Sequence, residues 1–193
     1  MEKLTQQVAD TLQDGDLIFI SINAFLYKQV ARGTGSWTSH IGFVLKENDE
    51  WMVYESKVPR VKRTPLKDYL SRTCNNEVAV LRLDKPLTPP EKHRLREAAH
   101  KRMGAFYHLG FRYESKRQFC SKFVHDCFKE AVGVEVGQVK TLKQLLAENP
   151  QANVNFWRYW YFGFIPWQRR TITPADQLRD PGLVKVFATA NIH

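Results

Sequence analysis

Three cysteines, Cys74, Cys120 and Cys127, occur in the chain, and no two of them have Cys-X-X-Cys spacing. An odd number without that spacing disfavours a disulfide framework and a cysteine zinc site, and it favours a reducing compartment. Cys120 stands in the sequence RQFCSKFV, at the predicted start of a helix and between Arg117 and Lys122. A helix N-terminus and neighbouring cations stabilise a thiolate, so this position suits a nucleophile.

Two other interpretations of Cys120 remain open. A capping box formed by Ser115 and Gln118 would place Cys120 in the second helical turn, where the effect of the helix dipole has mostly faded. Cys120 could also be a small buried apolar side chain, which is the interpretation for Cys127 on the apolar stripe of the same helix. Cys74 is expected to be a loop thiol that is more exposed than Cys120.

A nucleophilic cysteine needs a general base that is held in place by a third group. His40 begins a predicted strand after a loop rich in Gly and Ser, and His108 lies in a Tyr-His-Leu-Gly loop, so these two are the candidates for the base. Glu55, on the strand predicted to pair with that of His40, could orient the imidazole across the hairpin. A solvated carboxylate at a sheet edge is the alternative for Glu55. The other histidines point away from Cys120, lie off the apolar face of a helix, or end the chain: His125, His93, His100 and His193.

The elements that must position these residues follow from the hydrophobic periodicity. Strands are expected at 16–20, 40–46, 51–56, 78–83 and 182–188, and 57–63 is expected to be a basic loop. Helices are expected in the first dozen residues, at 65–70 after Thr64, from the Thr88–Glu91 capping box to about Met103, from about Cys120, and at 141–148. Early strands, central helices and one returning strand predict an α+β fold in which helices pack against an antiparallel sheet.

Composition limits the class of protein. The chain has 193 residues, 43% hydrophobic and 25% charged, which fits a single globular domain over residues 1–193. Its formal charge of +9 favours an anionic partner. The N-terminus has no signal-peptide core, and the most apolar stretch, 156–167, is too short to span a membrane. A soluble, cytoplasmic protein is therefore expected, and export without a cleavable signal stays open.

Four short segments together resemble a known family. They are 14–20 (DGDLIFI), 39–44 (SHIGFV), 53–56 (VYES) and 119–124 (FCSKFV). This set resembles the NlpC-type cysteine peptidases, which are papain-like in fold, but with the histidine half before the cysteine half. That order is similar to the circularly permuted YiiX/YebB-like hydrolases, a branch that includes enzymes like lecithin retinol acyltransferase. The resemblance covers nearly the whole chain and is closest to the YebB-like members.

The resemblance implies a catalytic set and a reaction. Cys120 matches the nucleophile, His40 the base and Glu55 the third, orienting position. Lys122 stands where the unpermuted family has glycine, and Glu rather than His at the third position is similar to the permuted branch. The implied enzyme is a cysteine hydrolase that cleaves an amide bond, peptide or isopeptide-like, through an acyl-thioester. Backbone N–H groups at the helix start would stabilise the oxyanion, and no cofactor or metal is required.

The substrate is expected to be a peptide, an amide or an acyl-containing molecule, and the net charge of +9 favours an anionic one. Arg117, Lys122, Tyr113 and Trp160 are the residues expected to contact it. Eight of the twelve residues in 156–167 are aromatic, and these rings are expected either to fill the core or, in part, to form a wall of the cleft that selects an apolar or acyl group.

Two rival functions remain at this point. A thiol acyltransferase or lipid-acting hydrolase of the same fold would fit the cations near Cys120 and the aromatic segment. A non-catalytic nucleic-acid-binding protein would fit the net charge, although the sequence has no nucleic-acid-binding motif. The sequence specifies neither the substrate nor the oligomeric state.

Overall fold

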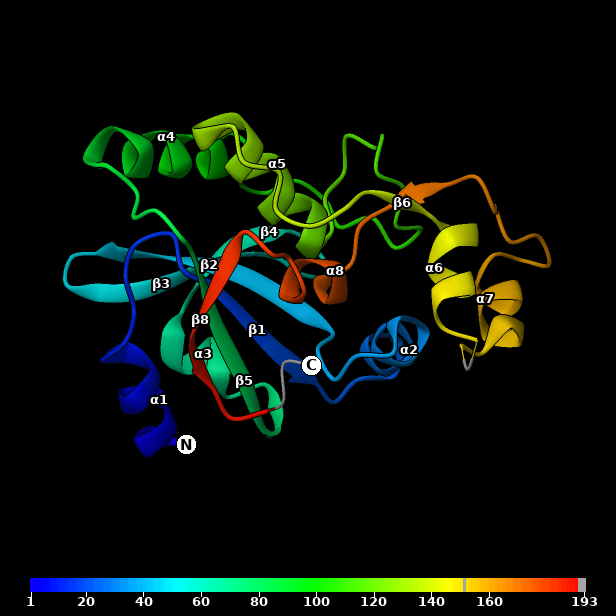
Figure 1. Cartoon of the computed structure of the whole chain (residues 1–193), viewed down its shortest axis with the longest axis horizontal. Helices are drawn as coiled ribbons and strands as arrows, with labels where there is room; N and C mark the ends of the chain where they lie inside the picture. The colour runs from blue at the N-terminus through cyan, green and yellow to red at the C-terminus, as the bar shows by residue number, and fades with distance from the viewer. Residues whose placement is uncertain (151, 191–193) are drawn as a thin grey trace.

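A computed structural model describes residues 1–150 and 152–190. Its centre is a six-stranded antiparallel sheet with the order β4-β3-β2-β1-β5-β8 (Figure 1). The strands are β1 (Leu17–Ile22), β2 (His40–Glu47), β3 (Glu50–Ser56), β4 (Val61–Pro65), β5 (Thr73–Leu83) and β8 (Leu183–Ala188). The central strands are apolar on both faces, and each face is covered by helices.

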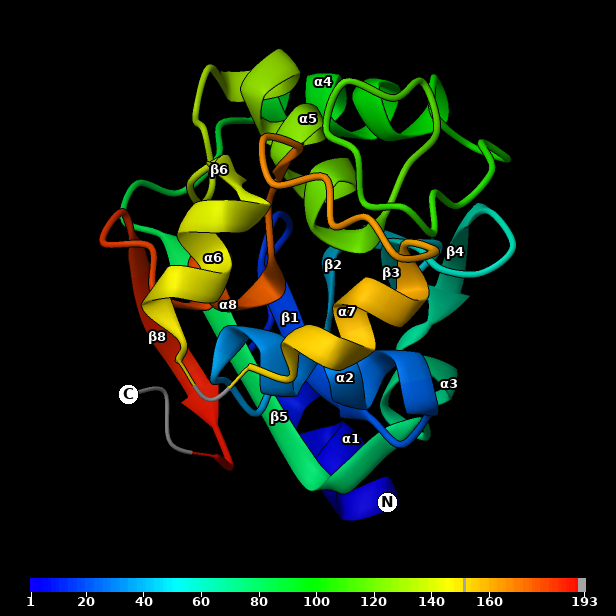
Figure 2. The same cartoon turned by 90° about the vertical axis from the view of Figure 1, so that its right-hand side faces the viewer.

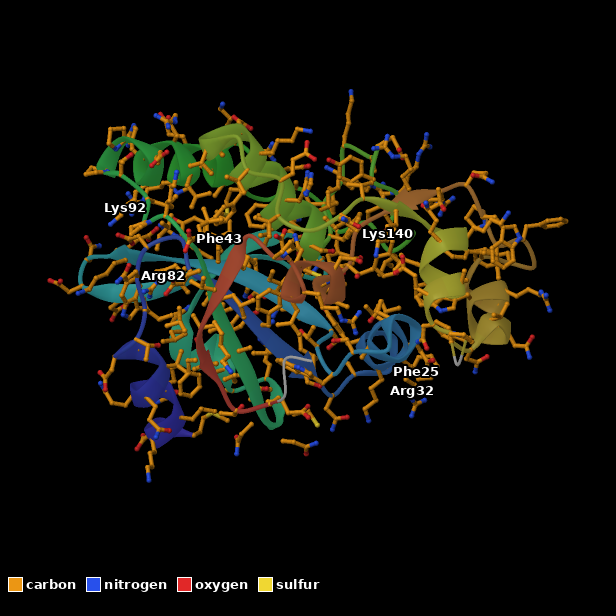
Figure 3. The ribbon with its side chains drawn as sticks, viewed as in Figure 1. Phe25, Arg32, Phe43, Arg82, Lys92 and Lys140 are labelled. Atoms are coloured by element: carbon orange, nitrogen blue, oxygen red, sulfur yellow. The ribbon has the colours of Figure 1, made fainter. Side chains whose placement is uncertain are left out.

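Successive side chains along each strand point to opposite faces of the sheet and so pack into two separate cores. Leu17, Phe19 and Phe43 face α4 (Pro89–His100) and α5 (Cys120–Val132). Ile18 and Ile20 face the opposite side, where α1 (Glu2–Ala9) and α3 (Leu66–Leu70) pack. Figure 3 shows Phe43 between the sheet and α5, where its ring stacks on Phe123 at 5.6 Å. These two cores hold the sheet rigid beneath the N-terminus of α5.

A third group of elements lies beyond one end of the sheet (Figures 1 and 2). The helix α8 (Pro174–Leu178) lies outside this group, because Leu178 belongs to the core between the sheet and α5. The group contains α2 (Phe25–Thr34), α6 (Leu142–Glu148) and α7 (Val154–Trp160), with the short strands β6 (Lys140–Thr141) and β7 (Arg170–Thr171). A small core holds it together: Leu142, Phe156, Trp157 and Ile165 are buried, and Leu26 packs against them. This core is separate from the two cores on the faces of the sheet.

The α+β fold, with its antiparallel sheet and packed helices, is confirmed, and three local expectations are corrected. Residues 61–63, the end of the basic loop expected at 57–63, instead begin the edge strand β4 (Val61–Pro65). Pro65 is the N-cap of α3 and not its first helical residue, so Thr64 belongs to β4. Met103 lies beyond the end of α4 and is exposed. The edge strand β4 tolerates Pro65 because one row of its backbone groups needs no partner.

Within the described residues, none of the helices has the length and apolarity that crossing a membrane requires.

Candidate active site

Cys120 is the first residue of α5. The preceding residue, Phe119, is the N-cap and has extended backbone angles, φ −135° and ψ 163°. The capping box considered for Ser115 and Gln118 does not start this helix, because the Ser115 hydroxyl accepts instead from the backbone N–H of Arg117 at 3.0 Å. Cys120 is therefore in the first turn, where free backbone N–H groups and the helix dipole favour an anion.

His40 is the first residue of β2 and is completely buried. It pairs with Ile20 of β1. Its ring lies between two tyrosines, with centroid distances of 5.6 Å to Tyr27 and 5.8 Å to Tyr69. Because His40 stands where the strand begins, the N-terminus of α5 can reach it even though the body of α5 packs against the sheet. The ring is thereby held in one orientation.

Glu55, on β3, orients the His40 ring. Its Oε2 lies 2.5 Å from Nε2 of His40, and both groups are fully buried. Thr64 donates a hydrogen bond to Oε1 at 2.6 Å, and Arg72 donates to both oxygens at 2.8 and 2.9 Å. Burial alone would raise the pKa of Glu55, but the hydrogen bonds and charges of these three partners lower it to about 2. Glu55 is thus an ionised carboxylate over the whole physiological range.

Gly42 explains how the carboxylate reaches the histidine. Gly42 stands on β2 between His40 and Phe43. Phe43 pairs with Tyr54, the residue that precedes Glu55 on β3. A Cβ atom at Gly42 would lie 2.8 Å from the carbonyl oxygen of Tyr54 and 3.4 Å from Cβ of Glu55. The glycine therefore permits the close approach of β3, and with it the diagonal contact between Glu55 and His40.

The second nitrogen of the His40 ring is free to serve Cys120. Nδ1 is buried and has no hydrogen-bond partner of ordinary geometry among the described residues. Burial lowers the pKa of His40, whereas hydrogen bonding and charge interaction with Cys120 and Glu55 raise it, and the net direction is upward. A raised imidazole pKa beside a thiol favours transfer of the thiol proton to the ring.

Tyr107 completes the surroundings of Cys120. It is held by a parallel bridge to Gln118 and by a hydrogen bond from its N–H to the carbonyl of Pro59 at 2.9 Å. Burial, the charge of Cys120 and the hydroxyl of Tyr27 raise the pKa of Tyr107 well above 10, and its hydroxyl interacts with both the side chain and the backbone N–H of Cys120. The phenol is consequently neutral and can donate a hydrogen bond next to the sulfur.

A cavity that is open to solvent on one side lies beside Cys120. Leu26 and Val30 of α2, Leu145 of α6 and Trp157 of α7 form much of its apolar wall. Tyr107 and Phe111 line it from the loop before α5. A cavity with apolar walls and a few polar groups around one thiol has the character of a binding site for an apolar group.

The structure brings together three of the residues selected from the sequence and leaves four outside the cavity. Cys120, His40 and Glu55 form one cluster. The cavity wall contains none of the four expected substrate contacts, Arg117, Lys122, Tyr113 and Trp160.

Those four side chains are exposed or have other partners. Lys122 pairs with Asp126 and lies over the ring of Tyr113, and Trp160 donates from Nε1 to the carbonyl of Leu109 at 3.0 Å. Arg117 is exposed. Three residues before Trp160, Trp157 is the member of the aromatic segment that lines the cavity, because α7 turns that side inward.

His108, the other candidate for the general base, is not part of the cluster, and three residues that do belong to the site were not expected from the sequence. His108 accepts from the N–H of Gly110 at 2.9 Å and is a satisfied loop histidine. Arg72 and Thr64, which hold Glu55, and the tyrosine hydroxyl at position 107 were missed as functional residues. Tyr107 is the tyrosine of the Tyr-His-Leu-Gly loop that drew attention to His108, whereas Arg72 had no signal in the sequence.

Comparisons with known proteins identify a family and relatives that resemble the chain in sequence and in fold. Residues 11–187 match the sequence model of a family described as permuted papain-like amidases, the YaeF/YiiX or C92 peptidase family. The uncharacterised protein YiiX of Escherichia coli (strain K12) is 28% identical over 174 residues, which are 90% of this chain and 85% of YiiX. The crystal structure of YiiX from Escherichia coli O157:H7 has a TM-score of 0.85 and 27% identity, and the match covers 94% of this chain and 99% of that one.

These comparisons support an enzyme and not a non-catalytic nucleic-acid-binding protein. The crystal structure of YiiX is described as that of a metalloprotein. In residues 1–150 and 152–190 of this chain, no three histidine, cysteine, aspartate or glutamate side chains are grouped so that they could hold a metal ion.

Proposed function

Because the chain belongs to the family of permuted papain-like amidases, we propose that it is a cysteine amidase in which Cys120 is the nucleophile, His40 the general base and Glu55 the orienting group. The observation that carries the proposal is the contact of 2.5 Å between Glu55 and Nε2 of His40, which leaves Nδ1 for the thiol. The raised pKa of His40 supports a thiolate–imidazolium pair before substrate binds.

The proposed reaction begins when Nδ1 of His40 takes the proton of the Cys120 thiol. The sulfur attacks the amide carbonyl carbon, and its oxygen becomes an oxyanion. In this proposal the backbone N–H of Cys120, at the start of α5, and the neutral hydroxyl of Tyr107 donate hydrogen bonds to that oxygen. When the tetrahedral intermediate collapses, the C–N bond breaks and the amine leaves with the proton from His40.

The second half of the reaction releases the acyl group. His40, neutral again, takes a proton from water, and the resulting hydroxide attacks the thioester carbonyl. The C–S bond breaks, the carboxylic acid leaves, and the thiolate–imidazolium pair is restored. Throughout, Glu55 stays ionised and stabilises the imidazolium form, because its pKa of about 2 is far below working pH.

The apolar cavity favours an acyl group that is itself apolar. Its wall of Leu26, Val30, Leu145 and Trp157 offers little to a charged or strongly polar chain. If a second amine or alcohol enters in place of water, the same thioester gives an acyltransferase, so this alternative differs only in the final acceptor. All three cysteines are free thiols, which supports action in a reducing compartment such as the cytoplasm.

Peptide mass spectrometry tests the proposal. Activated esters and N-acyl amides with chains of increasing length would be mixed with the protein, quenched in acid within seconds, and digested. We expect the acyl mass on Cys120, its loss on hydroxylamine treatment, and faster labelling as the chain lengthens. The matched control is Cys127→Ser, which should label normally, while Cys120→Ser should not form a thioester. Labelling that ignores Cys120, or that favours short polar acyl groups, would contradict the proposal.

A further inference from the structure

The loop between α7 and β7, residues 161–169, presents large apolar side chains to solvent. Phe162 is 96% exposed and Phe164 is 87% exposed. Tyr159, at the end of α7, is 82% exposed. An isolated apolar residue on a surface is ordinary, but three nearly bare aromatic rings within six residues form a patch of the kind that marks an interaction site.

The backbone of this loop is fixed, so the rings cannot easily fold inward. Phe162 and Gly163 both have positive φ, 53° and 98°, and the N–H of Gly163 bonds to the carbonyl of Arg158 at 2.8 Å. On the inner side, Tyr161 and Arg169 both donate to the carbonyl of Gly110, at 3.2 and 2.9 Å. The loop is thus tied to the segment before α5 while its phenylalanines point away from it.

The same region of the molecule is rich in cations. Three segments, 23–35, 106–113 and 152–170, contain six Lys or Arg residues and no Asp or Glu, whereas the whole chain has 29 and 20. The six are Lys28, Arg32, Arg112, Arg158, Arg169 and Arg170. Figure 2 looks onto the side of the molecule formed by α2 and α7, and Figure 3 labels Phe25 and Arg32 on α2. Phe25 is also exposed, at 69%.

We propose that this face docks on an anionic phospholipid bilayer, with Phe162 and Phe164 entering the interface and the cations contacting lipid headgroups. Exposed aromatic rings surrounded by Lys and Arg are the combination that binds such a surface. A second copy of the chain is a poorer occupant. Glu114 lies 3.8 Å from Arg112 and 3.6 Å from Arg170, but a symmetric contact through this face would still oppose two groups that each carry an excess of positive charge.

Docking in this way would connect the bilayer to the cavity. Leu26 of α2, Phe111 of the loop before α5 and Trp157 of α7 line the cavity beside Cys120, and all three come from the segments that form the docking face. An acyl chain could therefore pass from the membrane toward the thiol without crossing open water. The docking itself needs no catalytic chemistry, so it can be tested independently of the proposed function.

Vesicle sedimentation with the full chain tests the docking. Vesicles of phosphatidylcholine alone and of phosphatidylcholine with equimolar phosphatidylglycerol would be compared at 0.1 and 0.5 M NaCl. We expect binding to the anionic vesicles at low salt, at least tenfold weaker partitioning for Phe162→Ser/Phe164→Ser, and weaker binding at high salt. The matched control is Val134→Ser/Val184→Ser, which removes two exposed apolar side chains elsewhere and should change partitioning by less than twofold.

Two further measurements separate the outcomes. Cys120→Ser should bind vesicles like the unmodified protein, so a failure of the catalytic proposal would leave this result unchanged. Equal binding by the Phe162/Phe164 variant, equal binding to neutral and anionic vesicles, or no binding to either would overturn the proposal. So would light scattering that shows a dimer in the unmodified protein and a monomer in the Phe162/Phe164 variant, because the face would then belong to a second copy.

Discussion

Replacing Glu55 by Gln removes one negative charge from the centre of the candidate site while keeping the shape of the side chain. In the folded protein the pKa of Glu55 falls from 4.5 to about 2, and at 1.36 kcal/mol per pKa unit this corresponds to about 3 kcal/mol in favour of the ionised form. Part of that energy comes from His40, and the rest comes from Arg72 and Thr64. The amide would leave the imidazolium and the guanidinium without their counter-charge.

The effect on reactivity follows from the same interaction. If His40 contributes most of the 3 kcal/mol, losing it should slow alkylation of Cys120 by iodoacetamide at pH 6 by up to about 100-fold. At pH 9 a thiol ionises without help, since free cysteine titrates near pH 8.5, so the variant should recover much of its rate. The assay is peptide mapping of alkylated Cys120 across pH 5 to 9.

Stability should change in a pH window of its own. Because the pKa of Glu55 is lowered on folding, its contribution is present above about pH 4.5 and is lost as the pH falls toward 2. The melting temperature of the unmodified protein should therefore fall as the pH is lowered over that range, and the melting temperature of Glu55→Gln should fall less. Glu47→Gln is the matched control, since Glu47 also accepts from an arginine, Arg63, but lies at the far end of the hairpin. Unchanged alkylation at pH 6 in a folded Glu55→Gln protein would refute the reasoning.

Three further experiments test the reactivity of Cys120 and the roles of Tyr107 and Gly42. At pH 6.5 Cys120 should be alkylated faster than Cys74, although Cys74 is more exposed. Burial raises the pKa of Cys127, so this thiol should stay unmodified until the protein unfolds. Equal alkylation rates at Cys120 and Cys74 would contradict a thiolate at Cys120. Tyr107→Phe should lower kcat by about 10- to 100-fold with little change in KM, and an unaltered kcat would remove Tyr107 from the oxyanion site. Gly42→Ala would place Cβ 2.8 Å from a backbone oxygen of β3, so we expect a loss of about 1–3 kcal/mol in unfolding free energy by urea titration; full stability would show that β3 can move aside.

The parts of the fold that the sequence predicted well are those set by local pattern. The hairpin of β2 and β3 was expected because two apolar runs flank a short polar turn, and the structure pairs Phe43 with Tyr54 as such a hairpin requires. The capping box of Thr88 and Glu91 likewise opens α4. In each case neighbouring residues carry both the signal and the contacts that satisfy it.

The expectations that were corrected depended on how side chains pair and orient in three dimensions, which residue type and spacing do not specify. Thr64 looked like a helix cap, but its hydroxyl is used by Glu55, nine residues earlier. Lys122 was expected at the substrate, but its side chain is buried and the helical repeat places its ammonium beside Asp126, one turn further along α5. Trp160 was chosen from an aromatic run in which only the exact rotation of α7 decides which ring faces the cavity, and that rotation favours Trp157.

The candidate site itself divides in the same way. His40 and Glu55 are 15 residues apart on adjacent strands, so the hairpin that positions them is a local structure, and Gly42 between them is visible in the sequence. Cys120 follows 80 residues after His40, and only the packing of α5 on the sheet brings its N-terminus to the start of β2. A histidine and a carboxylate that are already joined need just one long-range contact to become a reactive site. In this chain the histidine and the carboxylate come first and are joined by a local hairpin, so the position of the nucleophile is the part of the site that depends most on the complete fold.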